Sequence, residues 1–252
     1  MRYTCDSKFS LSDNLFLRFS GLYLFIFFIS SAQAEWHGDI KLLSDYVFRG
    51  YSKSRGNPIV QGHVEYLDDA GWFAGLGASQ VRFDDQLAIG RAEIEIKPYV
   101  GWSLPISKDW RTELSVKGYI YDNKIFNHDA NYVEFYASLH YQDWISFQAS
   151  IAPDAYQRQA KVANFEINVR RDILDNVQFS AGLGYSKAAA LLDQDYFYWN
   201  AGTSWFVTPY LALDLRYVDA SLSSDQTSEE NYDEFYPRPQ DNKYLFSVTL
   251  GF

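Results

Sequence analysis

The feature that most constrains the fold is a strand pattern that continues to the last residue of the chain. Apolar side chains occupy every second position of this final segment: Tyr244, Phe246, Val248, Leu250 and Phe252. Because successive side chains of a strand point to opposite faces, the segment has one apolar face. Alternation over about ten residues is typical of a strand in a membrane barrel. A closing strand that ends in an aromatic residue predicts the insertion signal of bacterial outer-membrane barrels.

The same period of two recurs along the rest of the chain after residue 34. With the final strand it predicts twelve strands, over residues 36–49, 60–66, 72–79, 91–97, 110–120, 132–141, 145–151, 163–170, 177–185, 197–205, 211–217 and 243–252. No segment after residue 34 approaches a transmembrane helix. Only helices and closed barrels pair every backbone polar group within lipid. The sequence therefore predicts an all-β fold, a transmembrane antiparallel up-and-down β-barrel of about 12 strands.

The amino-terminal residues predict a cleaved signal peptide before the barrel. Basic residues precede a short apolar run over residues 19–29, and Ala32-Gln33-Ala34 has the small-x-small pattern of a cleavage site. The run is shorter than the roughly 20 residues of a spanning helix. The alternative is an anchor helix that is not cleaved. We expect residues 1–34 to be the signal peptide and residues 35–252 to be the outer-membrane β-barrel.

The connections and the tryptophans predict which face of the barrel meets lipid. Connections after even-numbered strands are short, and most of those after odd-numbered strands are long and polar, as in outer-membrane barrels. Six of the seven tryptophans fall at the short-turn ends of the predicted strands: Trp36, Trp72, Trp102, Trp110, Trp144 and Trp205. Because indole prefers the headgroup layer, we expect the apolar face to meet lipid. The alternative is a soluble periplasmic barrel or sandwich with that face inside.

Charged side chains alternate with the apolar ones and face the predicted lumen, the space inside the barrel wall. The candidate pore-lining residues are Asp45, Arg49, Arg91, Glu93, Glu95, Lys97, Arg111, Glu113, Lys117, Glu134, Glu166, Arg170, Asp214 and Arg216. Acids and bases on this face either form ion pairs that brace the wall or a constriction that screens solutes. Barrels of about eight strands are filled and those of sixteen to eighteen have wide pores, so twelve strands predict a narrow water-filled passage.

Two segments are candidates for the mouth of this passage. Asp45 and Arg49 are both predicted to point inward, and we expect them to help set the entrance. The loop over residues 50–57 either folds inward or stands out. A later loop, over residues 220–242, carries six acids against one base: Asp225, Glu229, Glu230, Asp233, Glu234 and Asp241 against Arg238. If it overhangs the mouth it favours cations at low salt, and otherwise it is only a solvated loop.

The sequence predicts that the protein is not an enzyme and has no cofactor. Adjacent acid and histidine residues, such as His128-Asp129 and the pair Asp84-Asp85, point to opposite faces of a strand and do not converge as in omptin-like proteases. His37, His63 and His140 are predicted inward, whereas outer-membrane phospholipases carry a Ser–His dyad on the lipid-facing surface. The only cysteine lies within residues 1–34, so thiolate sites are excluded and no metal site is expected.

The first predicted hairpin resembles a known family. Residues 44–52 (SDYVFRGYS), followed by Pro58, Gln61-Gly62 and residues 70–75 (AGWFAG), are similar to the signature of the proteobacterial TorF-type outer-membrane porins. Later matches are Glu93-Ile94-Glu95 and residues 98–102 (PYVGW). Residues 77–80 depart from the family pattern. The resemblance implies an outer-membrane barrel with porin activity and transfers no binding residues.

These observations predict a bacterial outer-membrane porin for passive diffusion of ions or small polar solutes through a narrow charged lumen. The alternatives are a structural or adhesion-type barrel without an open pore and, less favoured, an outer-membrane hydrolase. The expected partners are membrane lipid and lipopolysaccharide, the barrel-assembly machinery through the strand that ends at Phe252, and the solutes. A net charge of −10 argues against a nucleic-acid partner.

Overall fold

The structure, a computed structural model, describes residues 35–83, 91–142, 144–223 and 235–252. The predicted signal peptide therefore lies outside the described residues, as do Asp84-Asp85 and the acids at positions 225–234. Residues Glu35–Phe252 form one compact unit.

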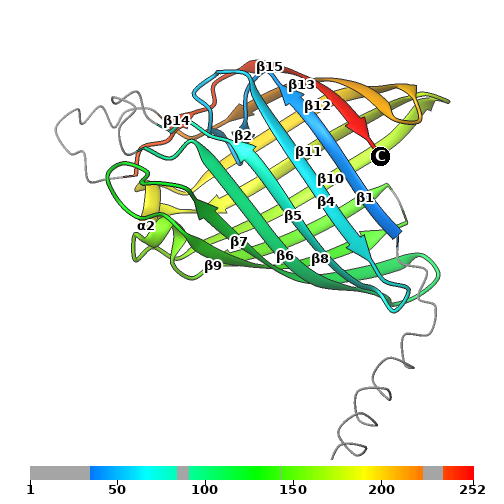
Figure 1. The fold of residues 1–252 in the computed structure, drawn as a ribbon, viewed down its shortest axis with the longest axis horizontal. Coiled ribbons are helices and arrows are strands. Elements are labelled where there is room, and N and C mark those ends of the chain that lie inside the picture. Colours follow the sequence, from blue (N-terminus) through cyan, green and yellow to red (C-terminus); the bar gives the residue numbers. More distant parts are fainter. Residues whose placement is uncertain (1–34, 84–90, 143, 224–234) are drawn as a thin grey trace, which may run out of the picture. The chain divides into compact units, whose positions relative to one another are not determined.

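Twelve long strands within the described ranges close into one antiparallel barrel (Figure 1). They are β1 (Glu35–Leu43), β4 (Ile59–Leu67), β5 (Trp72–Gln80), β6 (Ile94–Pro105), β7 (Trp110–Tyr121), β8 (Tyr132–Tyr141), β9 (Ile145–Ala152), β10 (Val162–Leu174), β11 (Val177–Lys187), β12 (Tyr196–Thr208), β13 (Leu211–Ala220) and β15 (Lys243–Gly251). Each strand pairs with its neighbours in this order, and β15 pairs with β1. The predicted all-β barrel of about 12 strands is confirmed.

The carboxyl-terminal strand closes the barrel against the first strand. Ile40 of β1 lies opposite Leu250 of β15, and the two strands run side by side in Figure 1. The terminal residue continues this pairing: the Phe252 N–H donates to the Gly38 carbonyl at 2.9 Å, and the Gly38 N–H donates back at 3.0 Å. The strand pattern that continues to the last residue is therefore the seam of the barrel.

The apolar face of the wall points outward. Large apolar side chains of the strands are exposed all round the barrel, among them Ile40, Leu76, Val100, Leu114, Phe135, Phe165, Leu183, Leu215 and Leu250. Five tryptophans near the short-turn ends of their strands are exposed as well: Trp36, Trp72, Trp102, Trp110 and Trp205. The alternative arrangement, with the alternating apolar residues packed inside, is wrong.

The first and fourth strands differ from their predicted ranges. β1 ends at Leu43 instead of continuing to Arg49, because the chain leaves the wall at Ser44 and turns into the lumen. Residues 44–58 there contain two short strands, β2 (Val47–Phe48) and β3 (Tyr51–Ser52). Strand β6 begins at Ile94, so Arg91 and Glu93 precede the wall instead of forming part of it.

Three further short elements lie on the long-loop side of the barrel. They are η1 (Ala155–Gln157), α2 (Ala189–Leu192) and β14 (Arg238–Pro239). In the described part of the chain, no helix has the length and apolarity to cross a bilayer.

An arginine in the outer apolar face tests which face meets lipid. Leu114, near the middle of β7, is 54% exposed. We expect L114R to lower the free energy of unfolding by about 2–4 kcal/mol, the cost of a basic side chain at the bilayer midplane. The measurement is denaturant unfolding of the protein in phospholipid vesicles, followed by heat-modifiable migration on gels. Gln148 of β9, which faces the lumen, provides the control, and equal losses for L114R and Q148R would contradict the orientation.

Candidate functional site

The candidate site is the lumen, and its most unusual part is the inward hairpin, residues 44–58. Within this hairpin Val47 pairs with Ser52 and Phe48 with Tyr51, and β14 adds a third short strand beside β3. The two-residue turn is formed by Arg49 (φ 46°) and Gly50 (φ 86°). Tight hairpin turns of this kind need positive φ at both positions, which suits glycine and strains most other residues.

Arg49 extends from the tip of the hairpin to the far wall of the lumen. Its guanidinium donates to Glu134 of β8 at 2.6 Å, to Glu166 of β10 at 3.1 Å and to Ser150 of β9 at 3.0 Å. Tyr196 of β12 donates to the Arg49 carbonyl at 2.8 Å. Contacts with four strands fix both the side chain and the backbone of Arg49, which explains how the strained conformation is tolerated.

Lys53 anchors the other arm of the hairpin. Its side chain is completely buried, and Nζ lies 2.5 Å from Oε2 of Glu95 in β6. The hydroxyl of Tyr46, also in the hairpin, donates to the second oxygen of Glu95 at 2.8 Å. The Glu95 side chain is buried as completely as that of Lys53. This pair therefore fixes the hairpin to the wall on the side of β6.

Asp45 ties the start of the hairpin to the closing strand. Lys243 of β15 lies 2.7 Å from one carboxylate oxygen, and the hydroxyls of Ser52 and Ser54 donate to the other at 2.5 and 2.6 Å. Burial alone would raise the pKa of the Asp45 carboxyl, but the Lys243 ammonium and the two hydroxyls hold that pKa below its ordinary value. Asp45 is therefore charged while it holds the hairpin in the lumen.

Aromatic side chains from other loops pack against the hairpin and fill the loop-side half of the lumen. Tyr51 hydrogen-bonds Tyr156 of η1 at 2.8 Å between hydroxyl oxygens, and both contact the ring of Phe235. The cavity left between the hairpin and β8–β12 measures about 20 Å³. That is room for about one water molecule. Solutes therefore have little room between the hairpin and these five strands.

The short-turn half of the lumen is open, and we call this part the vestibule. It holds a cavity of about 360 Å³. Polar residues of β7 to β13 line it, including Arg111, Glu113, His140, Ser146, Asn168, Arg170, Ser180, Asn200 and Arg216. Arg111 pairs with Glu113, and Arg216 pairs with Asp214 at 3.2 Å while donating to Asn200 at 2.6 Å. The vestibule can therefore hold a small hydrated solute among charges of both signs.

The structure divides the candidate pore-lining residues into four groups. Two belong to the hairpin: Asp45 and Arg49. Five lie on the wall around or next to it: Glu95, Lys97, Lys117, Glu134 and Glu166. Five face the vestibule: Arg111, Glu113, Arg170, Asp214 and Arg216. The last two, Arg91 and Glu93, form a 3.3 Å pair ahead of β6, where Glu93 is exposed.

Sequence reasoning missed Lys53 and the aromatic rings that surround it. Residues 44–49 continue the alternation of the first predicted strand, so their period gave no sign that the chain leaves the wall at Ser44. Of the two positions left open for the loop over residues 50–57, the structure shows the inward one. The available signal was Arg49-Gly50 between two aromatic residues, a spacing that allows a two-residue hairpin. The loop after β13 was partly anticipated: Phe235 and β14 fold over the hairpin.

His63 and His140 face the lumen, as predicted, whereas His37 is exposed at the start of β1, 3.4 Å from Glu35. His63 Nδ1 lies 3.4 Å from Asp39, and His63 Nε2 lies 2.5 Å from the hydroxyl of Tyr99. His140 lies 3.4 Å from Glu113. None of these residues is on the outer face, where a phospholipase-type dyad would act. Among the residues that the structure describes, no group of three or more His, Cys, Asp or Glu side chains is placed to hold a metal ion.

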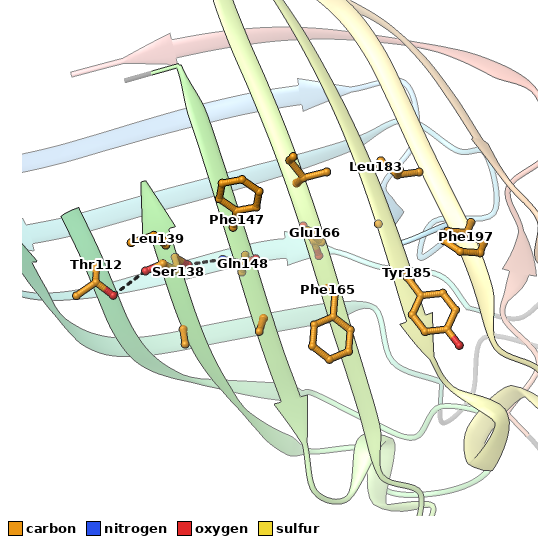
Figure 2. A pocket seen from close by; sticks show the side chains of 14 residues that line it. Thr112, Ser138, Leu139, Phe147, Gln148, Phe165, Glu166, Leu183, Tyr185 and Phe197 are labelled. Atoms are coloured by element: carbon orange, nitrogen blue, oxygen red, sulfur yellow. Dashed lines mark hydrogen bonds between the residues drawn. The ribbon is translucent and has the colours of Figure 1, made fainter. Parts of the chain in front are cut away.

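A further hollow lies on the outer face of the wall and belongs to the apolar surface. Figure 2 shows the side chains that border it on β9 to β12, Phe147, Phe165, Leu183, Tyr185 and Phe197. Behind them, the Gln148 amide donates to the Ser138 hydroxyl at 3.1 Å toward the lumen. Since the hollow faces away from the vestibule and the hairpin, it is not part of the candidate site.

Comparison with known proteins agrees with the fold. A family model described as "Bacterial protein of unknown function (Gcw_chp)" matches residues 30–252. No curated protein matches the sequence. Among solved structures, a KdgM porin has a TM-score of 0.53 and 9% identity over 86% of this chain and 99% of that one. A NanC porin has a TM-score of 0.54 and 9% identity over 85% and 98%. At these identities the likeness shows a shared barrel fold and no more.

Acidification should release the inward hairpin. Because the pKa of Asp45 is lowered in the folded protein, its charge stabilises the seated hairpin above pH of about 3.9, and this stabilisation is lost as the pH falls through the lowered pKa. We expect amides of residues 45–54 to exchange hydrogen faster between about pH 4 and pH 2, after correction for intrinsic rates. The measurement is hydrogen exchange with mass spectrometry.

A D45N variant separates this effect from general acid unfolding. Its hairpin should exchange faster than that of the wild type at pH 5 and change less on further acidification. Equal pH dependence of the hairpin amides in both proteins would show that Asp45 does not hold the segment.

Proposed function

We propose that this protein is an outer-membrane channel closed on its loop side by the inward hairpin. The chain belongs to the Gcw_chp family of bacterial proteins of unknown function. It would allow passive diffusion of ions or small polar solutes. The observation that carries the proposal is a polar, charged vestibule enclosed by a wall whose outer face is apolar. The barrel fold shared with the KdgM and NanC porins supports it.

The proposed location is the bacterial outer membrane. An exposed apolar belt round a closed barrel is stable only in contact with lipid, and barrels of this kind have short turns on one side and long loops on the other. Connections of two to four residues join the strands on the tryptophan-rich side, for example between β11 and β10 or β13 and β12, and longer ones lie on the other side. The predicted signal peptide and closing strand support the same location.

The vestibule and the hairpin would act in series along one passage. Arg111, Arg170 and Arg216 line the vestibule together with amide and hydroxyl groups, so a polar solute there keeps hydrogen-bond partners. Beyond it the hairpin must leave before a solute can pass. Glu134 and Glu166, which hold Arg49 in the closed conformation, would then line the opened part of the lumen.

The resemblance to TorF-type porins supports the same proposal and stays a prediction. Its most specific segment, residues 44–52, is the first part of the inward hairpin. If the resemblance reflects a common function, the inward hairpin would be a feature that this chain shares with those porins.

A barrel without an open pore is the second candidate. It is favoured by the small cavity of about 20 Å³ between the hairpin and β8–β12, where side chains fill the lumen. Such a barrel would serve a structural or adhesion role through its loops. No arrangement of histidines in the described residues favours the hydrolase alternative.

Conductance of the protein in planar bilayers tests the proposal. Removal of the Arg49 side chain leaves Glu134 and Glu166 without their buried cation, and breaking such a pair costs about 3 kcal/mol. We therefore expect R49A to increase the open fraction of discrete conductance steps by about a hundred-fold. Heat-modifiable migration of R49A should remain, because the wall strands keep their pairing.

Arg55 provides the matched control. It lies in the same hairpin, but its guanidinium donates to the Phe83 carbonyl and not to Glu134 or Glu166. R55A should conduct like the wild type. Silence of both the wild type and R49A across a salt gradient would favour the barrel without a pore.

A further inference from the structure

The ammonium group of Lys53 lies among six aromatic rings. Its Nζ is 4.1 Å from the ring centre of Phe48 and 4.9 Å from that of Tyr119. Four more ring centres lie between 5.4 and 6.0 Å, those of Tyr46, Tyr121, Tyr156 and Phe83. We call these six rings and Glu95 the aromatic cage. A cation over the face of an aromatic ring within about 6 Å is attracted by the ring quadrupole.

Most of the cage is independent of the hairpin. Tyr119 and Tyr121 belong to β7, Phe83 follows β5, and Tyr156 lies in η1. Glu95 comes from β6. Tyr46 and Phe48 are the hairpin's own contribution. The wall and the neighbouring loops therefore present four rings and a carboxylate to whatever occupies this position.

The polar atoms of the cage suit an ammonium group. Nζ of Lys53 donates to Glu95 Oε2 at 2.5 Å and to the Tyr121 hydroxyl at 3.2 Å. The same Tyr121 hydroxyl donates to Glu95 at 2.7 Å, which orients the carboxylate. The Lys53 ammonium is therefore surrounded by a carboxylate that balances its charge, a neutral hydroxyl that accepts a hydrogen bond, and the faces of aromatic rings.

These contacts exceed what an ion pair needs. Lys97 also contacts Glu95, at 3.3 Å, yet its ammonium lies over the ring of Tyr46 only and its side chain is partly exposed. Cation–π contacts of energetic weight occur about once per 70–80 residues, whereas here six rings converge on one nitrogen. Aromatic cages that recognise quaternary ammonium ligands use the same attraction between a cation and several rings.

We propose that the aromatic cage is a binding site for primary ammonium groups and that Lys53 is its tethered ligand, which keeps the hairpin in the lumen. Solutes that carry a short primary alkylammonium group are the class of ligand that would compete with Lys53 from the loop side. Only the part of this proposal that concerns opening of the passage rests on the proposed function. The ammonium site itself does not depend on whether the barrel conducts.

Chemical rescue of a K53A variant tests the site. The substitution removes three carbons and the ammonium nitrogen, which propylammonium replaces. The readout is the rate at which chymotrypsin cleaves the hairpin after Phe48 and Tyr51 in the folded protein in detergent. K53A should be cleaved about ten times faster than the wild type, because loss of the Lys53 contacts would shift the equilibrium between the held and the released hairpin about tenfold. Propylammonium should reverse most of this increase.

Two controls separate ammonium recognition from cavity filling. Propan-1-ol at the same concentration has the same carbon chain and should leave K53A cleavage unchanged. K97A lacks the other lysine that contacts Glu95 but keeps Lys53 in the cage, so propylammonium should not slow its cleavage. Equal protection by propan-1-ol, or no protection by propylammonium, would overturn the proposal.

A refolding measurement covers the case in which K53A does not fold alone. Refolding with propylammonium and not with propan-1-ol, judged by heat-modifiable migration, would support the site, and failure with both would overturn it. Conductance separates this proposal from the proposed function. Rescue of K53A in a barrel that never conducts contradicts only the channel, whereas a conducting barrel without rescue contradicts only the cage.

Discussion

The rest of the structure depends on the hydrogen bonding of the backbone in lipid. A strand at the depth of the apolar belt has no water to pair with, so every N–H and C=O must find a partner in the wall. The chain meets this requirement by pairing β1 with β15, down to the reciprocal bonds between Gly38 and Phe252. Closure then determines the two faces, because alternate side chains must point to lipid or to the lumen.

Because most large apolar side chains of the wall face outward, few of them remain to fill the lumen. A lumen lined by charged and polar groups is stable when water fills it or when another segment supplies partners. The vestibule shows the first solution and the inward hairpin the second. Glu95 and Glu134 are almost fully buried, and each is paired with a base of the hairpin. Since an unpaired buried charge costs about 3–5 kcal/mol, these carboxylates favour one position of the hairpin over others.

The wall could be predicted from the sequence because its signal is local. Each strand shows its own alternation, and Leu114 or Phe165 is assigned to the outer face without knowledge of its neighbours. The hairpin could not, because Tyr46 and Phe48 fit the alternation of the preceding strand equally well. What turns the chain inward is a set of distant contacts. Arg49 and Glu166 are 117 residues apart, and such a pair leaves no mark in the sequence near either residue.

The same carboxylates that hold the hairpin are those that an emptied lumen would present to water. Arg49 and Lys53 neutralise Glu134, Glu166 and Glu95 in the closed conformation. If the hairpin leaves, it takes both cations away and exposes the three acids beside Lys97 and Lys117. In the proposed channel, opening and the charge of the passage would therefore be coupled: a solute that supplies positive charge would stabilise the emptied wall, whereas an anion would have to rely on those two lysines.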